Sequence, residues 1–291
     1  WDERGSNNLS GRIRTAEIDW NNNVIYCASS GGNIWKGTLQ GDNWTSLNDY
    51  MQIKGIVMLR LIDVNNTQRL LIGSGNYFYY TDNDAVTIRT STGLDFLDDW
   101  GYVKRTILKE SDNTIYILAN EWDYDDWHEV GAIYKSSDYG ESFSKILTLN
   151  TDEGFSSTLG AGHFDIWTPR YFNDDVYILH NDEFYKITSS DELEFIGNIP
   201  SSGTNENLLT GGMGMNAPFF YAHIGNRIFH SMNGGLSWSD KGERPQWWFT
   251  VNSFNASNVD YQEIYYGGME AFRSENSGNS WTLVNSWWEY Y

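Results

Sequence analysis

"SSDYGESF" at residues 136–143, "SMNGGLSW" at 231–238 and "SENSGNSW" at 274–281 share one four-point pattern. Each begins with Ser, has Asp or Asn two residues later and Gly two residues after that, and ends on a large aromatic residue. Three copies of this pattern in 291 residues indicate internal repetition. The length of the repeat therefore decides the fold.

Weaker copies of the pattern set that length. They lie at 37–44, 81–88 and 188–195, and each keeps part of the four-point pattern. The last position of the pattern falls at residues 44, 88, 143, 195, 238 and 281, so the copies are 43 to 55 residues apart. A period in this range is typical of propeller blades.

The residues before each copy read as short strands. The third repeat contains "VKRTILKE", "NTIYILAN", "GAIYKSS" and "SFSKILTL", rich in β-branched and aromatic residues and separated by turn residues. No segment sustains a helical apolar period. The sequence therefore predicts an all-β fold, a β-propeller of four-stranded antiparallel blades.

Six blades are visible in one predicted propeller domain that spans residues 1–291. The expected blades lie at about 9–50, 51–95, 101–150, 163–200, 207–243 and 247–286. A longer propeller of seven or eight blades stays open, because the first and last residues do not look like natural gene ends. We expect the chain to be a mature or excised piece with further domains around it.

The repeated pattern resembles the Asp-box, or BNR repeat, of sialidases, sortilin-type receptors and some glucan hydrolases. The whole chain is most similar to propellers of large secreted proteins from Bacteroidetes-type bacteria. "LSGRIRTAEID" at 9–19 and "GGNIWKGTLQGDNWTSL" at 31–47 carry that similarity. The resemblance implies a propeller and an extracellular or cell-surface location, but it does not fix the function.

We expect each box to close the turn between the third and fourth strands of a blade. Gly permits a backbone angle that other residues resist, Asp or Asn bonds backbone amides, and the aromatic residue packs as a hydrophobic peg. The structural box residues are Ser136, Asp138, Gly140, Phe143, Ser231, Asn233, Gly235, Trp238, Ser274, Asn276, Gly278 and Trp281. A catalytic role is disfavoured, because neutral Asn replaces Asp in two copies and cannot act as a general base.

Charge and composition narrow the partners. The chain has 39 acidic and 19 basic residues, a net charge of −20, which disfavours nucleic acid and anionic membrane surfaces. No apolar stretch is long enough to span a membrane. The single cysteine, Cys27, excludes a disulfide within the chain.

An oversized connection marks the candidate site. In the third blade the loop between the second and third strands expands to "EWDYDDWHEVG" at 121–131. Such loops and the blade crossings share one face of a propeller, so aromatic and acidic residues gather there. The expected ligand-binding residues are Trp122, Asp123, Tyr124, Asp125, Asp126, Trp127, Trp100, Trp247 and Trp248. Aromatic rings beside carboxylates suit a glycan or a cationic protein partner, whereas packing of the Trp residues between blades is the alternative.

No cofactor is expected, except that Ca²⁺ could bind the oxygen ligands Asp123, Asp125, Asp126 and Glu129. No catalytic residue is assigned. The arginines do not assemble into the triad that sialidases use to bind the substrate carboxylate. In the glucanases that the chain resembles, the cleft lies between two propellers, and this chain supplies one. The sequence favours a non-catalytic secreted or surface propeller that binds a glycan or a protein. A glycoside hydrolase and a purely structural module are the alternatives.

Overall fold

The computed structural model describes ten stretches of the chain. They are residues 13–75, 77–98, 101–125, 127–150, 160–169, 175–201, 207–245, 253–257, 260–267 and 270–285.

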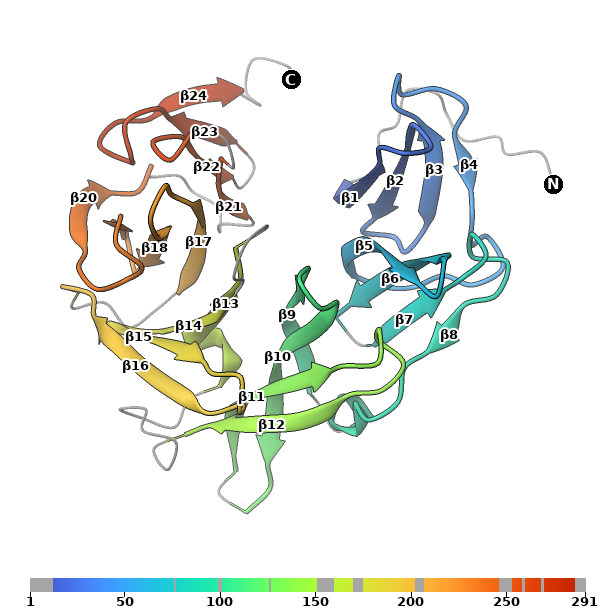
Figure 1. Ribbon diagram of the computed structural model, residues 1–291, viewed down its shortest axis with the longest axis horizontal. Coiled ribbons are helices and arrows are strands. Elements are labelled where there is room, and N and C mark those ends of the chain that lie inside the picture. Colours follow the sequence, from blue (N-terminus) through green and yellow to red (C-terminus); the bar gives the residue numbers. More distant parts are fainter. Residues whose placement is uncertain are drawn as a thin grey trace. The chain divides into compact units, whose positions relative to one another are not determined.

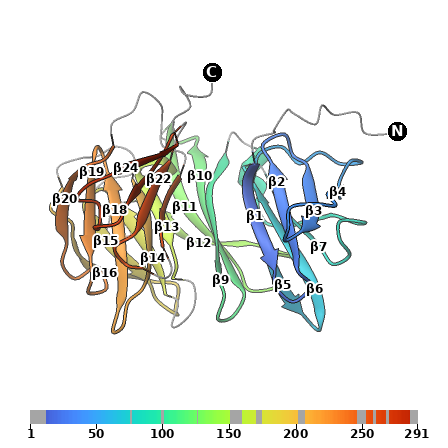
Figure 2. The ribbon, with the colours of Figure 1, turned by 90° about the horizontal axis from the view of Figure 1, so that it is seen from above.

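The first two sheets are antiparallel meanders in chain order (Figure 1). Their strands are β1 (Ile13–Asp19), β2 (Val24–Ser29), β3 (Ile34–Thr38), β4 (Thr45–Ser46), β5 (Ile56–Val64), β6 (Thr67–Ser74), β7 (Phe78–Thr81) and β8 (Arg89–Thr90). β5 and β6 form a long hairpin that is seen from the side in Figure 2. A short 3₁₀ helix, η1 (Asp95–Asp98), precedes the third sheet.

The third sheet has the order β12-β11-β10-β9. Its strands are β9 (Tyr102–Lys109), β10 (Thr114–Asp123), β11 (His128–Ser136) and β12 (Ser144–Leu149). β10 has 10 residues and β11 has 9, whereas β14 and β15 in the next sheet have 5 each. Among the described hairpins that join the second and third strands of a sheet, that of the third sheet has the longest strands.

The last three sheets repeat the antiparallel meander. A 3₁₀ turn, η3 (Ala161–His163), leads into them. Their strands are β13 (Phe164–Trp167), β14 (Val176–His180), β15 (Glu183–Ile187), β16 (Leu193–Asn198), β17 (Leu208–Met213), β18 (Pro218–Ile224), β19 (Arg227–Ser231), β20 (Ser239–Glu243), β21 (Ser253–Ala256), β22 (Ile264–Gly267), β23 (Ala271–Ser274) and β24 (Thr282–Asn285).

The described residues form six four-stranded antiparallel sheets, which are the blades of a β-propeller and confirm the predicted fold class. The chain divides into two compact units, and the third sheet contributes residues to both. One unit contains Trp1–Leu108, Asn113–Ala119 and Tyr134–Ser144, and the other contains Lys109–Asp112, Asn120–Ile133 and Lys145–Tyr291. In the first unit β1 packs beside β5, and in the second β17 packs beside both β13 and β21.

Apolar residues from neighbouring sheets share each core. In the first unit Tyr26 and Ile34 pack in one cluster with Leu59 and Ile72 of the next sheet. In the second unit Phe184 of the fourth sheet packs on Phe220 of the fifth, with 5.0 Å between ring centroids. A single sheet could not bury these faces by itself, so stacking of repeats supplies the core.

The stretch 121–131 is not the irregular loop that the sequence analysis predicted. β10 continues to Asp123 and β11 begins at His128, so only Tyr124–Trp127 lies between the strands. β10 and β11 are hydrogen-bonded neighbours in the third sheet, so most of this stretch belongs to strands. The third blade therefore carries a lengthened β-hairpin, and Tyr124, Asp125 and Trp127 are the described residues at its tip.

Candidate recognition site

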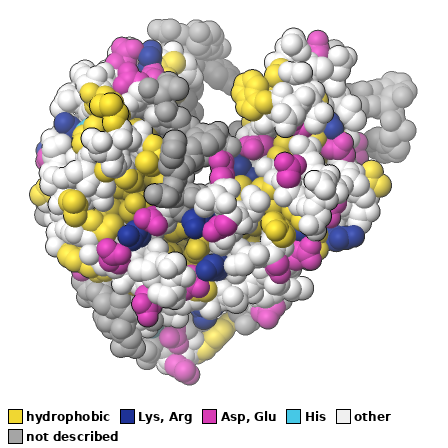
Figure 3. Space-filling model, viewed as in Figure 1, with side chains coloured by type: hydrophobic (Ala, Val, Ile, Leu, Met, Phe, Trp, Pro, Cys, Tyr) yellow, Lys and Arg dark blue, Asp and Glu magenta, His cyan; other side chains and the backbone are white. Residues whose placement is uncertain are grey.

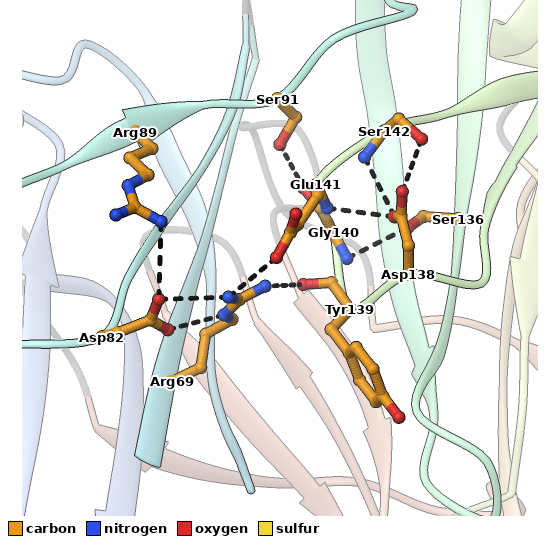
Figure 4. Close-up of polar contacts among 10 residues, drawn as sticks. All are labelled: Arg69, Asp82, Arg89, Ser91, Ser136, Asp138, Tyr139, Gly140, Glu141 and Ser142. Atoms are coloured by element: carbon orange, nitrogen blue, oxygen red, sulfur yellow. Dashed lines mark hydrogen bonds and ion pairs between the residues drawn. The ribbon is translucent and has the colours of Figure 1, made fainter. Parts of the chain in front are cut away.

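The box of the third sheet is a compact hydrogen-bonded turn between β11 and β12 (Figure 4). The Ser136 hydroxyl donates to Asp138 Oδ1 at 2.7 Å and accepts from the Gly140 amide at 3.0 Å. Asp138 Oδ1 also accepts from the amides of Glu141 and Ser142, at 3.1 and 2.9 Å. One serine and one carboxylate thus hold the whole turn.

Asn builds the same turn in the fifth sheet. Ser231 Oγ lies 3.0 Å from Asn233 Oδ1 and 3.0 Å from the Gly235 amide, and the Ser237 amide donates to Asn233 Oδ1 at 3.0 Å. The amide group of Asn233 adds a bond to Ser237 Oγ at 2.9 Å. The side-chain oxygen organises this turn without a negative charge.

The sixth sheet repeats this geometry. Ser274 Oγ donates to Asn276 Oδ1 at 3.0 Å and accepts from the Gly278 amide at 2.8 Å. The Ser280 amide donates to Asn276 Oδ1 at 2.9 Å. The degenerate copy in the second sheet has the equivalent bonds from Thr81 and Asn83. In all four turns these side-chain oxygens form their hydrogen bonds within the turn itself, which fits a structural role.

Two box glycines are required by space as well as by backbone angle. Gly140 has φ +85° and Gly235 has φ +88°, in the left-handed region that favours glycine. A Cβ on Gly140 would lie 2.9 Å from the Phe78 ring, and one on Gly235 would lie 2.3 Å from the Phe184 ring. Each glycine therefore lets its turn pack on the third strand of the preceding sheet.

The aromatic residues that end the boxes pack between neighbouring sheets or against aromatic residues of their own sheet. The Phe143 ring centroid is 5.1 Å from that of Phe78, and Trp238 is 5.2 Å from Phe184. Trp281 lies against the cluster of the fifth and sixth sheets, 6.0 Å from Tyr266. The boxes thus connect neighbouring blades in addition to closing their own hairpins.

An arginine that the sequence analysis did not single out strengthens one of these connections. Arg69 on β6 bonds Asp82 at 2.6 Å, and it reaches Glu141 at 3.0 Å and the Tyr139 carbonyl at 3.2 Å (Figure 4). Its guanidinium lies 4.4 Å from the Tyr80 ring centroid, and its side chain is only 5% exposed. Arg69 therefore connects the second sheet to the box of the third sheet by an ion pair and a hydrogen bond. No spacing in a single sequence signals this pairing.

The tip of the β10–β11 hairpin presents aromatic side chains to solvent. Trp127 is 73% exposed and Tyr124 is 50% exposed, with their ring centroids 6.4 Å apart in an edge-to-face arrangement. Trp122, farther down β10, is half-buried. Large exposed aromatic pairs are costly to leave in water and are typical of interaction sites.

Backbone geometry holds the tip. Asp123 Oδ1 accepts from the Asp125 amide at 2.8 Å, and Trp127 has φ +54°, a strained angle for a bulky residue. Glu121 at the base pairs with Lys145 on β12 at 2.8 Å. The aromatic pair thus stands on a tied hairpin.

Calcium stays a prediction. Asp126, one of the four candidate ligands, lies outside the described residues. Glu129 Oε2 lies close to Gly160, which precedes β13, since a Cβ added to Gly160 would lie 2.7 Å from it. Within the described ranges no three His, Cys, Asp or Glu side chains are grouped so that they could hold a metal ion.

The structure brings together five of the nine predicted ligand-binding residues on one hairpin, namely Trp122, Asp123, Tyr124, Asp125 and Trp127. Asp126, Trp100, Trp247 and Trp248 lie outside the described residues. An exposed Trp20, 72% exposed after β1, was not among the predicted site residues.

Two arginines on strands that lead into boxes have carboxylate partners nearby. Arg227 pairs with Asp240 across β19 and β20 at 2.6 Å, and Arg273 pairs with Glu263 at 2.5 Å. These pairs employ both guanidinium groups in local contacts.

No protein-family model and no curated protein sequence matches this chain. Solved structures share its fold. The extracellular domain of the proposed one-component system BT4673 from B. thetaiotaomicron is 11% identical, with a TM-score of 0.61 over 96% of this chain and 34% of that one. YCF48 bound to D1 peptide is 12% identical, with a TM-score of 0.55 over 94% of this chain and 82% of that one.

PorZ, an essential bacterial surface component of the type-IX secretion system of Porphyromonas gingivalis, is 15% identical. Its TM-score is 0.52, over 96% of this chain and 33% of PorZ. This chain thus spans about a third of the length of BT4673 and PorZ. Extracellular propellers of Bacteroidetes are therefore among its structural neighbours, and at these identities the likeness shows the fold alone. In the described part of the chain, no helix has the length and apolar character needed to cross a membrane.

Proposed function

We propose that this chain is a non-catalytic recognition propeller of an extracellular or cell-surface protein, and that the tip of the β10–β11 hairpin contacts a glycan or protein partner. The observation that carries the proposal is the exposed pair Tyr124 and Trp127 on a tied hairpin. The repeated boxes need no such extension, because their hydrogen bonds and pegs lie elsewhere.

The neighbours support this context. BT4673 is described by its extracellular domain and PorZ as a surface component, and both are longer than this chain. YCF48, for which this chain covers most of the length, was solved with a bound peptide. A propeller of about this size therefore supports peptide recognition as one option, beside the glycan option that the aromatic tip suggests.

The test is a binding panel of polysaccharides and peptides, with release of sugar products followed in the same wells. We expect at least one ligand to bind the wild-type chain and to lose about tenfold or more in affinity to Tyr124→Ala/Trp127→Ala. Trp20→Ala is the matched control, since Trp20 is 72% exposed against 73% for Trp127 but lies after β1.

Binding that the double variant leaves unchanged would overturn the placement at the tip. Released products would overturn the non-catalytic assignment. A complete lack of ligand across the panel would count against recognition and in favour of a structural module.

A further inference from the structure

We infer that the interface between the fifth and sixth sheets responds to acid: protons on His223 and His230 detach the sixth sheet from the fifth, while the second sheet stays folded. This inference does not depend on the hairpin tip. It follows from the place of the two histidines, from the charges around their rings and from how the sixth sheet is held.

Both histidines lie in the apolar interface between the two sheets. His223 on β18 is 0% exposed and His230 on β19 is 5% exposed. In the strand register His223 pairs with Ile228 and His230 pairs with Tyr221, and residues directly opposite each other share a face of the sheet. Ile228 and Tyr221 belong to the core cluster that the fifth sheet shares with the sixth. The His223 ring centroid is 5.6 Å from that of Tyr266 on β22.

In the described part of the chain, the charged groups that act on these two rings are cations. Arg244, which follows β20, acts on His223, and Lys241 on β20 acts on His230. The chain has 39 acidic residues, and acidic side chains are spread over the face drawn in Figure 3, but no described carboxylate acts on either ring. The backbone of Gly225 favours the charged form of His223, as the smallest of the effects on that ring. A proton on either histidine therefore places positive charge beside positive charge.

The other groups that face the pair are aromatic. The Tyr221 ring is parallel to the His230 ring, with 4.2 Å between centroids, and its hydroxyl donates to the Tyr261 carbonyl at 2.6 Å. Burial raises the pKa of Tyr221, and the charge of Asp260, before β22, adds to this effect, so the phenol stays neutral. The face of a neutral ring attracts a cation, but by much less than the cost of burying one.

A third buried histidine shows how a compensated ring is held. His180 in the fourth sheet is 0% exposed, and its Nδ1 lies 2.9 Å from Glu183 Oε2 while its Nε2 lies 3.2 Å from Asn181 Nδ2. In contrast, both ring nitrogens of His223 and the Nε2 of His230 are buried without a hydrogen-bond partner. A protonated ring donates from both nitrogens, so protonation leaves unsatisfied donors in this interface as well as an uncompensated charge.

The sign of the acid effect follows from these surroundings. Burial, aided by Arg244, lowers the pKa of His223 from 6.5 to about 4, and burial, aided by Lys241, lowers the pKa of His230 from 6.5 to about 4. Once the sixth sheet is detached, water reaches both rings and their pKa values return to about 6.5. The detached state therefore binds protons first as pH falls. Attachment weakens from about pH 6.5 to about pH 4, and these two groups weaken it no further below that.

The sixth sheet is held less firmly than the fifth. Its strands β21 to β24 have 4 residues each, whereas β18 of the fifth sheet has 7. The fifth sheet packs on its other face against the fourth, through Phe220 and Phe229. On β22, Tyr266 is buried but the neighbouring Tyr265 is 40% exposed. Local opening is easiest where few buried contacts hold an element, so the sixth sheet is the part that detaches.

The test is hydrogen–deuterium exchange of the wild-type chain between about pH 7 and about pH 5, where most carboxylates keep their charge. Protection factors are compared, because they correct for the slower intrinsic exchange in acid. We expect protection of β21 to β24 to fall by about a hundredfold or more over this range, since two histidines are linked to the opening. Protection of β5 to β7, which contain no histidine, should change by less than about threefold.

Histidine variants identify the groups responsible. In His223→Phe/His230→Phe the loss of protection in the sixth sheet should shrink to less than about threefold, because neither ring can take a proton. His180→Phe removes a buried histidine of the fourth sheet and should leave the loss as in the wild type. An unchanged midpoint of thermal unfolding at neutral pH verifies that each variant is folded. His223→Phe alone should remove about half of the logarithmic loss, which keeps the test decisive where the double variant does not fold.

Three results would overturn the inference. One is a wild-type sixth sheet that keeps its protection down to about pH 5. Another is equal loss in β5 to β7 and in β21 to β24, which would show that acid unfolds the whole chain. The third is a loss that persists in the double variant. None of them bears on ligand binding at the hairpin tip, so the proposed function would stand.

Discussion

At the scale of single residues, Asp138 stabilises the turn between β11 and β12 through its hydrogen bonds. Its carboxylate accepts from Ser136, Glu141 and Ser142. Asn does the same work in two other boxes. We therefore expect Asp138→Asn to be nearly neutral and Asp138→Ala to cost about 1–2 kcal/mol, the usual cost of losing a capping side chain. Hydrogen–deuterium exchange at the Ser142 amide measures the loss locally.

The same residue predicts a pH effect with a definite sign. Burial by itself would raise the pKa of Asp138, but hydrogen bonds from Ser142, Ser136 and the Glu141 amide outweigh it and hold the pKa below 3.8. Its stabilising contribution is present above the unfolded pKa and is lost as pH falls through the lower folded pKa. In Asp138→Asn the midpoint of thermal unfolding should depend less steeply on pH below about pH 4 than in the wild type. An unchanged dependence on pH would contradict the role assigned to Asp138.

A buried histidine, His223, should make the free energy of unfolding fall at a higher pH than Asp138 does. Burial, aided by the charge of Arg244, lowers the pKa of His223 from 6.5 to about 4. The unfolded chain binds the proton first, so stability is lost as pH falls from about 6.5 to about 4, by on the order of 3 kcal/mol. His223→Phe should reduce that slope in unfolding experiments across this range. His230, whose pKa burial also lowers to about 4, should keep the rest of it. A slope equal to that of the wild type would show that other groups cause it.

At the scale of elements, Arg69 links the β6–β7 hairpin to the box between β11 and β12. Because its side chain is buried and its partners are half-exposed, Arg69→Ala should cost about 1–3 kcal/mol, less than loss of a fully buried pair. Denaturant unfolding with probes in the β11–β12 turn measures this loss.

Arg227 supplies the matched control for that experiment. Its pair with Asp240 is exposed, so Arg227→Ala should cost under about 1 kcal/mol. Equal losses for the two variants would show that Arg69 does not act as an interblade link.

The hairpin tip marks the limit of what local sequence shows. "EWDYDDWHEVG" stands out by length and composition, and its residues do form the aromatic tip. The extension of β10 and β11 into this stretch could not be predicted. Its alternation of aromatic and acidic residues is as compatible with a loop as with two strands. Pairing across the hairpin decided the structure, and pairing is a non-local interaction.

At the scale of the whole molecule, repetition made the fold predictable. Six weak or strong boxes set the period, and four short apolar stretches per period set the blade, which together define a propeller. The contacts between blades were not predictable, since Arg69 meets Glu141 across 72 positions of sequence and Glu141 stands at a variable position of its box. The partner likewise depends on surface exposure, which only the folded hairpin reveals.

The most direct test of the recognition account is the ligand panel with wild-type chain, Tyr124→Ala/Trp127→Ala and Trp20→Ala side by side. We expect a ligand whose binding is lost in the tip variant, kept in the Trp20 variant and accompanied by no released product. Equal binding by all three proteins would contradict it, because the exposed aromatic pair would then have no part in recognition.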